Sequence, residues 1–223
     1  VGKNLMPEKI NLKIDWASKD AVKYACQNWH YSKTVPCGKI VKVGVWEDNK
    51  FIGVVLFSRG ANPYLFNSFN LTQDKGCELT RIALDKHKSN VSQIMSLAIR
   101  KLKSLCPDLE LIISFADADQ EHLGIIYQAT NWIYSGLSNK NKKGTAYIIN
   151  NKKVHSKTAN ERVRSRNLRG TLDNIKRVYN TENVRHHITK GKHKYLMPLN
   201  KTMRNKVILL SKPYPKATTL AEI

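Results

Sequence analysis

The chain has 223 residues, of which 41% are hydrophobic and 25% charged, the composition of an ordinary globular protein. Its 38 Lys and Arg residues outnumber 17 Asp and Glu residues, so the formal net charge is +21. The sequence lacks an apolar run near the ~20 residues of a membrane span and shows no secretory signal in residues 1–20, so we expect a cytoplasmic protein that does not enter a membrane. The chain has four scattered cysteines, Cys26, Cys37, Cys77 and Cys106. Because no two of them form a CxxC pair, we expect free thiols.

The positive charge is concentrated in the last third of the chain. Residues 151–223 hold 18 Lys or Arg and 4 Asp or Glu, against 20 and 13 in residues 1–150. Such an excess is commonly tolerated where the partner is a polyanion, so nucleic acid is the first expected partner and an anionic membrane surface the second. A merely soluble basic surface is the plain alternative. We expect a globular domain at 1–150 and a basic extension at 151–223.

Hydrophobic periodicity predicts alternating helices and strands in the first region. A helix begins after Ser18, a good N-cap, and Asp48-Asn49 joins two strands as a β-hairpin. The expected order is helix 18–29, strands 40–46, 51–57 and 77–84, helix 91–105, strand 109–116, helix 123–130, and strands 132–136 and 145–149. This order indicates an α/β protein of the α+β kind, a mixed sheet with helices on both faces.

The loop between strand 77–84 and helix 91–105 is a candidate anion site. A helix N-terminus offers unpaired N–H groups and a positive dipole end, which suit a phosphate or pyrophosphate. Asn90 followed by Gln93 matches a loose capping box, so a well-capped surface helix with solvated lysines is the alternative. The sequence here has neither a glycine-rich P-loop nor a GxGxxG motif.

Two short motifs carry side chains suited to catalysis. WHYS follows the first helix and contains His30, Tyr31 and Ser32; the imidazole can be a general base or a metal ligand, and the phenol an acid or a stacking surface. SFAD ends the buried strand 109–116 and contains Asp117, where a carboxylate can be a base or a ligand. The alternatives are that His30 and Tyr31 only end a helix and that Asp117 caps the next one.

Helix 123–130 and the extension offer further candidates. Tyr127 and Asn131 are four residues apart and would share a helix face, although the segment also fits a plain amphipathic helix. In the extension, basic residues interleaved with tyrosines suit phosphate contacts and stacking. These DNA-binding candidates are Arg162, Arg164, Arg166, Arg169, Arg185, Lys190, Lys192 and Lys194. Apolar residues in 196–210 predict that the chain packs back on the first domain, while a disordered tail is the alternative for 151–170.

The order of elements resembles that of the N-acetyltransferase-like (GNAT) fold. In that fold a central strand is followed by a pyrophosphate-binding loop and helix, matched here by CELTRIAL and KSNVSQ, and then by a strand, a helix and a final hairpin. More specifically, WHYS, CELTRIAL, NVSQIMSLAI and SFADADQEHLGIIYQATNWIYSG together resemble the Mom family of phage DNA-modification proteins, over residues 20–150. The stretch KGKHKYLMPL is also similar to phage relatives.

This resemblance implies an enzyme that adds a carbamoylmethyl (acetamido) group to the exocyclic amine of adenine in double-stranded DNA. The modification would protect phage DNA from host restriction, which places the protein in the host cell cytoplasm. Because that amine lies in a crowded base pair, the enzyme is expected to extrude the base. The implied donor is acetyl-CoA or a related molecule, although the loop lacks the glycine-rich acyltransferase signature and leaves another donor open.

The resemblance also implies site residues. The catalytic positions are His30, Tyr31, Ser32 and Asp117. The donor-side positions are Glu78, Arg81, Lys88, Ser89, Asn90, Val91 and Ser92, with Tyr127 and Asn131 beyond them. The family further suggests an iron held by His30 and Asp117, although two ligands are few for a metal.

Two other functions remain open. One is an N-acetyltransferase acting on a small amine, a protein or RNA, which the large positive charge disfavours. The other is a DNA-binding protein without catalysis, which the intact WHYS and SFAD motifs disfavour. The sequence also leaves open a homodimer.

Overall fold

The computed structural model describes residues 10–217 except 37, 61, 139 and 142. The chain forms two compact units, each built from separate stretches of sequence. The first unit comprises Val1–Phe115, Gly124–Gly136 and Lys194–Ile223, and the second comprises Ala116–Leu123 and Leu137–His193. The change in charge near residue 150 therefore does not coincide with a boundary between the units, because the second unit contains residues on both sides of it.

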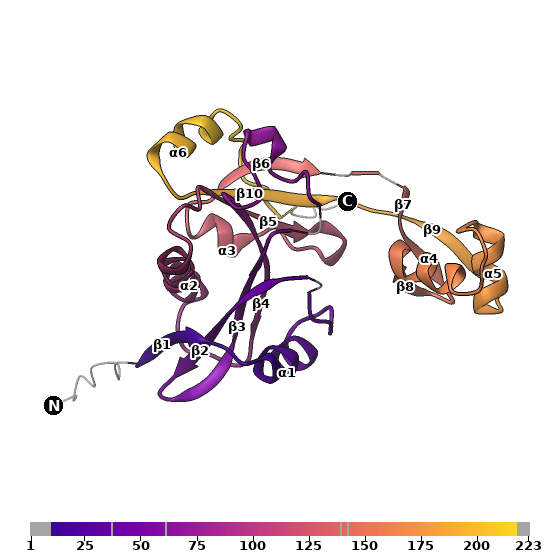
Figure 1. Ribbon diagram of the computed structural model, residues 1–223, viewed down its shortest axis with the longest axis horizontal. Coiled ribbons are helices and arrows are strands. Elements are labelled where there is room, and N and C mark those ends of the chain that lie inside the picture. The colour runs from indigo at the N-terminus through magenta and orange to yellow at the C-terminus, as the bar shows by residue number, and fades with distance from the viewer. Residues whose placement is uncertain (1–9, 37, 61, 139, 142, 218–223) are drawn as a thin grey trace, which may run out of the picture. The chain divides into compact units, whose positions relative to one another are not determined.

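A seven-stranded mixed sheet forms the centre of the fold, in the order β1-β2-β3-β4-β5-β10-β6 (Figure 1). Strands β1 to β4 pair antiparallel in succession, and β4 pairs parallel with β5. A parallel pair requires a crossover, and helix α2 supplies it. The strands are β1 Leu12–Trp16, β2 Ile40–Glu47, β3 Lys50–Ser58, β4 Gly76–Leu84, β5 Leu111–Asp117, β6 Ile133–Ser138 and β10 Lys192–Pro198.

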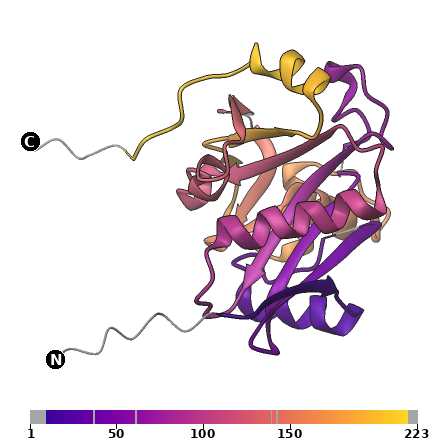
Figure 2. The ribbon, with the colours of Figure 1, turned by 90° about the vertical axis from the view of Figure 1, so that its left-hand side faces the viewer.

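Helices α1 (Lys19–Trp29) and α2 (Val91–Leu105) cover opposite faces of the antiparallel strands (Figures 1 and 2). Ser18 caps α1 as predicted, since its hydroxyl accepts a hydrogen bond from the N–H of Ala21. Ala25 and Cys26 of α1 pack against Val54 and Leu56 of β3. The buried residues of α2 lie three or four positions apart on one face of the helix, and this spacing made the helix predictable from the sequence. They are Ile94, Met95, Ala98 and Leu102. These helices confirm the expected mixed α/β fold.

The turn between β2 and β3 fixes the end of β2. Asp48 and Asn49 both adopt positive φ angles, 47° and 66°, as a tight two-residue hairpin turn requires. Glu47 and Lys50 then pair across the turn. The predicted hairpin is confirmed, and its register places Glu47 at the last position of β2.

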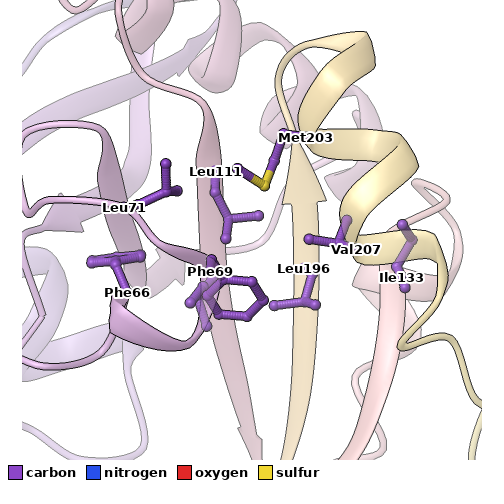
Figure 3. Packing of buried hydrophobic residues seen from close by; sticks show 9 residues of the cluster. Phe66, Phe69, Leu71, Leu111, Ile133, Leu196, Met203 and Val207 are labelled. Carbon is purple, nitrogen blue, oxygen red and sulfur yellow. The ribbon is translucent and has the colours of Figure 1, made fainter.

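A second hydrophobic cluster lies where strands β5, β10 and β6 pack against the short helix η1 (Asn67–Phe69) and helix α6 (Lys201–Ile208). Figure 3 shows Phe66 and Phe69 beside Leu111 of β5 and Leu196 of β10, with Met203 of α6 above them. Met203 and Val207, from the segment after residue 195, thus belong to the core of the first unit.

The second unit has a small core of its own. A three-stranded antiparallel sheet, in the order β8-β7-β9, packs against two helices, with Tyr147, Val163 and Ile175 buried between them. Its elements are β7 Lys143–Ile149, β8 Lys152–His155, α4 Ser156–Arg164, α5 Leu172–Tyr179 and β9 Val184–Ile188. The disordered alternative for residues 151–170 is therefore wrong, because β8 and α4 occupy much of that range.

Several expectations need correction. Strands β6 and β7 do not form the expected final hairpin, since they belong to different sheets. Helix α3 is shorter than expected, at Ile125–Gln128, and Asn131 follows it with a φ of 58°. Strand β1 lies where no strand was expected. Asn90 is the N-cap residue of α2, but its side chain makes no capping bond among the described residues.

Within the described residues, no helix has the length and hydrophobicity that crossing a membrane would require. Cys26, Cys77 and Cys106 are free thiols, as predicted, and Cys37 lies outside the described residues.

Candidate active site

His30 and Arg81 form the centre of a polar cluster in the first unit. His30 is the first residue beyond α1, with extended φ and ψ of −106° and 137°, so its side chain leaves the helix direction. Arg81 comes from β4, where it pairs with Leu56 of β3, a residue of the core beneath α1. Its guanidinium Nη1 lies 2.8 Å from Nδ1 of His30. The end of α1 and the middle of β4 thus meet at this imidazole.

This geometry fixes the tautomer of His30. A guanidinium has donors and no acceptor, so Nδ1 of His30 must accept the hydrogen bond from Arg81. The N–H of Ser32 also points at Nδ1, at 3.1 Å. The ring is therefore neutral with its proton on Nε2, which makes Nε2 a hydrogen-bond donor and not a proton acceptor.

The remaining WHYS residues complete the cluster. The Ser32 hydroxyl lies 2.8 Å from His30 Nδ1 and also contacts Arg81. Arg81 reaches Thr34 through Nη2, at 3.2 Å. The Tyr31 ring stacks on the His30 ring with centroids 4.4 Å apart and is 52% exposed. An exposed aromatic ring beside a fixed imidazole offers a flat surface on which a planar molecule can stack.

The hydroxyl of Tyr127 on α3 is held in place by a hydrogen bond to β5. Its hydroxyl lies 2.7 Å from the Ser114 hydroxyl on β5, which in turn donates to the carbonyl of Leu79 on β4. Since Ser114 has one proton, Tyr127 must donate to Ser114. Burial raises the pKa of Tyr127 to about 12, and the charges of Tyr31 and Glu78 act on it in the same direction. Tyr127 is thus a buried phenol that stays protonated at neutral pH.

The loop before α2 donates backbone hydrogen bonds to a carboxylate from the β2–β3 hairpin. Both carboxylate oxygens of Glu47 accept from the N–H of Lys88, at 3.1 and 3.0 Å, and one accepts from the N–H of Ser89, at 2.6 Å. Glu47 is only 7% exposed. Burial alone would raise its pKa, but the hydrogen bonds from Ser89 and Lys88 outweigh it and hold the pKa below its ordinary value. The carboxylate is therefore ionised at neutral pH.

The other donor-side positions surround this loop. His87 Nδ1 donates to the carbonyl of Ser89, at 2.7 Å, which further fixes the loop backbone. Ser89 is buried, Lys88 and Asn90 are exposed, and Val91 and Ser92 begin α2 half-buried. Asn131 is exposed beyond the end of α3 and does not share a helix face with Tyr127.

Asp117 lies in the second unit, at the end of β5. One oxygen of its carboxylate accepts from the N–H of Asp119, at 3.0 Å, so it caps the short helix η2 (Ala118–Gln120). The capping alternative for Asp117 is thus observed, and it leaves the second carboxylate oxygen outside that contact.

Asp119 is the centre of a charged cluster that sequence reasoning missed. Its side chain, 9% exposed, accepts from Lys153 Nζ at 2.7 Å, His187 Nε2 at 2.8 Å and the N–H of Lys190 at 2.8 Å. Thr189 donates as well, at 3.1 Å. Burial opposes ionisation, but these hydrogen bonds outweigh it and hold the Asp119 pKa well below its usual range. The cluster ties η2 to β8 and to the end of β9.

Seven of the eight predicted DNA-binding residues lie in the second unit. Arg164, Arg169 and Arg185 are exposed. Arg162 lies over the ring of Tyr179, 4.5 Å from its centroid, and Arg166 donates to the carbonyl of Val178. Lys190 and Lys192 are also exposed. The described segment therefore presents basic side chains from α4, the loop after it and β9.

Lys194 differs from the other seven, since it belongs to the first unit. Its ammonium lies 4.8 Å from the centroid of Phe69, and burial lowers its pKa. A half-buried ammonium packed on an aromatic ring is better placed to stabilise the fold than to contact a phosphate.

Comparison with known proteins identifies the family. The sequence profile of the Mom protein family matches residues 11–216. The chain belongs to the Mom family. A relative, the methylcarbamoylase mom of Escherichia phage Mu, is 26% identical over 212 residues, which are 92% of this chain and 84% of the relative.

Solved structures that resemble this Mom-family chain include an acetyltransferase of Bacillus subtilis in complex with CoA, with 13% identity and a TM-score of 0.48, over 86% of this chain and 100% of that one. Spermidine N-acetyltransferase from Vibrio cholerae, in complex with CoA and spermine, has 9% identity and a TM-score of 0.46, over 84% of this chain and 95% of that one. Family membership supports a transferase.

The structure does not support the iron expected at His30 and Asp117. Nδ1 of His30 accepts from Arg81, and the proton on Nε2 occupies the lone-pair position that a metal would need. Asp117 accepts from Asp119 within its own unit. Among the residues that the structure describes, no group of three or more His, Cys, Asp or Glu side chains is placed to hold a metal.

Proposed function

We propose that this Mom-family chain transfers a carbamoylmethyl group to the exocyclic amine of adenine in double-stranded DNA, and that the modification protects phage DNA from host restriction. The match of the family over residues 11–216 carries the proposal. The relative of phage Mu is named a methylcarbamoylase, and the positive charge of this chain suits a DNA substrate.

The transfer makes definite demands on the site. A bond forms between the adenine N6 and a carbon of the transferred group, the bond between that carbon and the rest of the donor breaks, and N6 loses a proton. We propose that Asp117 takes this proton, as the resemblance to the Mom family implies, and that His30 does not, since it is protonated on Nε2 and its other nitrogen is engaged by Arg81. His30 Nε2–H then donates a hydrogen bond to the donor molecule as charge develops on it.

Binding of the target base follows from the same residues. The exposed ring of Tyr31 offers a stacking surface for an adenine turned out of the duplex, and Ser32 and Arg81 hold the adjoining His30 in place. The basic residues of the second unit contact the DNA backbone in this proposal. The donor in this proposal already carries the carbamoylmethyl group on a leaving group, because acetyl-CoA itself would deliver only an acetyl group; the leaving group departs with the electrons of the broken bond.

Nucleoside mass spectrometry tests the proposal. Plasmid DNA is prepared from cells that express the unaltered chain, Asp117→Ala, or Asp108→Ala as a control at an exposed carboxylate. A deoxyadenosine heavier by one carbamoylmethyl group is expected with the unaltered chain and with Asp108→Ala, and not with Asp117→Ala. Acetylated polyamines or proteins in the same cells, without any modified nucleoside, would instead establish an N-acetyltransferase.

A further inference from the structure

The backbone N–H groups of Lys88 and Ser89, just before α2, both donate to one carboxylate group and so form a cradle for an anion. Successive N–H groups that point into one concavity bind an anion, and the loop precedes the N-terminus of a 15-residue helix. The strand–loop–helix arrangement places them directly after β4, whose residue Arg81 belongs to the candidate active site. A donor with a pyrophosphate would be expected to use these groups.

In this chain the cradle already contains an anion. Glu47 presents an ionised carboxylate to the N–H groups of Lys88 and Ser89 through three contacts of 2.6 to 3.1 Å. The tight hairpin turn at Asp48-Asn49 sets the position of Glu47, and the loop backbone is fixed on its other side by His87. The carboxylate therefore belongs to the built structure of the loop.

We propose that Glu47 is a specificity-determining residue that takes the place of a donor phosphate at this loop. A phosphate entering the cradle would have to displace Glu47 and leave an ionised, buried carboxylate without its hydrogen bonds. It would also lie next to a like charge. The site therefore selects a donor that places no phosphate on Lys88 and Ser89. The proposal rests on the proposed function only in calling the bound molecule a group donor.

Binding of inorganic pyrophosphate and of coenzyme A tests this proposal on the full chain. Amide signals of Lys88 and Ser89 are followed by ¹⁵N NMR during titration, because the many surface lysines would give anion binding that calorimetry alone cannot localise. We expect no saturable shift of these two amides in the unaltered chain. In Glu47→Ala we expect saturable shifts and pyrophosphate binding at least about ten-fold tighter at this loop.

Two variants make the outcome decisive. Asp48→Asn is the matched control, since it removes one negative charge at the neighbouring position and keeps an oxygen acceptor for the N–H of Asn11; it should not gain binding. Glu47→Gln replaces Glu47→Ala if the latter does not fold. Saturable shifts of the two amides in the unaltered chain, or a folded Glu47 variant that gains no binding, would overturn the proposal. Failure of the proposed function would show separately, as unmodified DNA from cells with the unaltered chain.

Discussion

Nη1 of Arg81 donates a hydrogen bond to Nδ1 of His30 across 2.8 Å, although 51 residues separate the two along the chain. This contact decides which nitrogen of the imidazole carries its proton. His30 is therefore a hydrogen-bond donor through Nε2. Its Nδ1 is held by a guanidinium whose charge does not change with pH in the physiological range.

Substitution of His30 separates a donor role from a base role. Asparagine can accept from Arg81 in place of Nδ1 but cannot reach the position of Nε2, whereas glutamine can place an N–H there. We expect His30→Asn to lower the rate of DNA modification about 10²–10³-fold and His30→Gln to lower it less. The measurement is single-turnover modification of a DNA duplex by both variants. Equal and complete loss in both, with intact folding, would contradict the donor role.

The hydroxyls of Tyr127 and Ser114 are expected to stabilise the fold through their hydrogen bond. Ser114→Ala leaves the buried Tyr127 hydroxyl without its acceptor and should lower the free energy of unfolding by about 1–3 kcal/mol. Tyr127→Phe should cost about 1 kcal/mol. The double variant should be less destabilised than the sum of the two, which denaturant unfolding of all four proteins would measure. Additive losses would show that the two hydroxyls act independently.

Asp119 should make the second unit sensitive to acid. Its pKa is lower in the folded than in the unfolded chain, where it is near 3.9. Its contribution to stability is therefore fully present above that unfolded value and is lost as the pH falls toward the folded one. Asp119→Asn should destabilise the second unit at pH 7 and flatten this acid dependence. Amide hydrogen exchange of α4 and β9 at pH 7 and at about pH 2, below the unfolded pKa, would reveal it once the intrinsic pH dependence of exchange is subtracted. An unchanged acid dependence in the variant would refute the assignment.

Exposed arginines of the second unit should contribute to DNA affinity through phosphate contacts. Each of Arg164→Gln and Arg169→Gln should weaken binding to duplexes of any sequence and reduce the slope of log affinity against log salt by about 1. The matched control is Arg100→Gln on α2 of the first unit, where Arg100 is also exposed. Fluorescence anisotropy over a range of salt concentrations gives the slopes. Equal effects of all three substitutions would mean that only net charge matters.

Local signals made part of this fold predictable. The helix capped by Ser18, the hairpin around Asp48-Asn49 and the apolar stripe of α2 each depend on residues close together in sequence, and each is found where expected. The position of β10 was not predictable in this way, because strand pairing between distant segments has no periodic signature in either strand.

The same limit applies to the site. The WHYS motif indicated a polar cluster, yet its partner Arg81 was placed on the donor side only by family resemblance. The role of Glu47 at the loop before α2 was missed, because a single charged residue at the end of an apolar strand is usually exposed to solvent. The contact between Asp119 and His187 spans 68 residues and could not be inferred from either segment alone.

The position of β10 also constrains how the molecule is made. Residues 192–198 fill the gap between β5 and β6, two strands synthesised long before them. Until β10 arrives, both neighbours present an open edge, which is a template for pairing with another chain. A ribosome would have to translate past residue 198 before the sheet could close, so the nascent protein depends on long-range strand pairing, which is slow. Premature termination before Lys192 would thus leave β5 as an open edge and β6 without its neighbour in the sheet, and such a chain should be prone to aggregate.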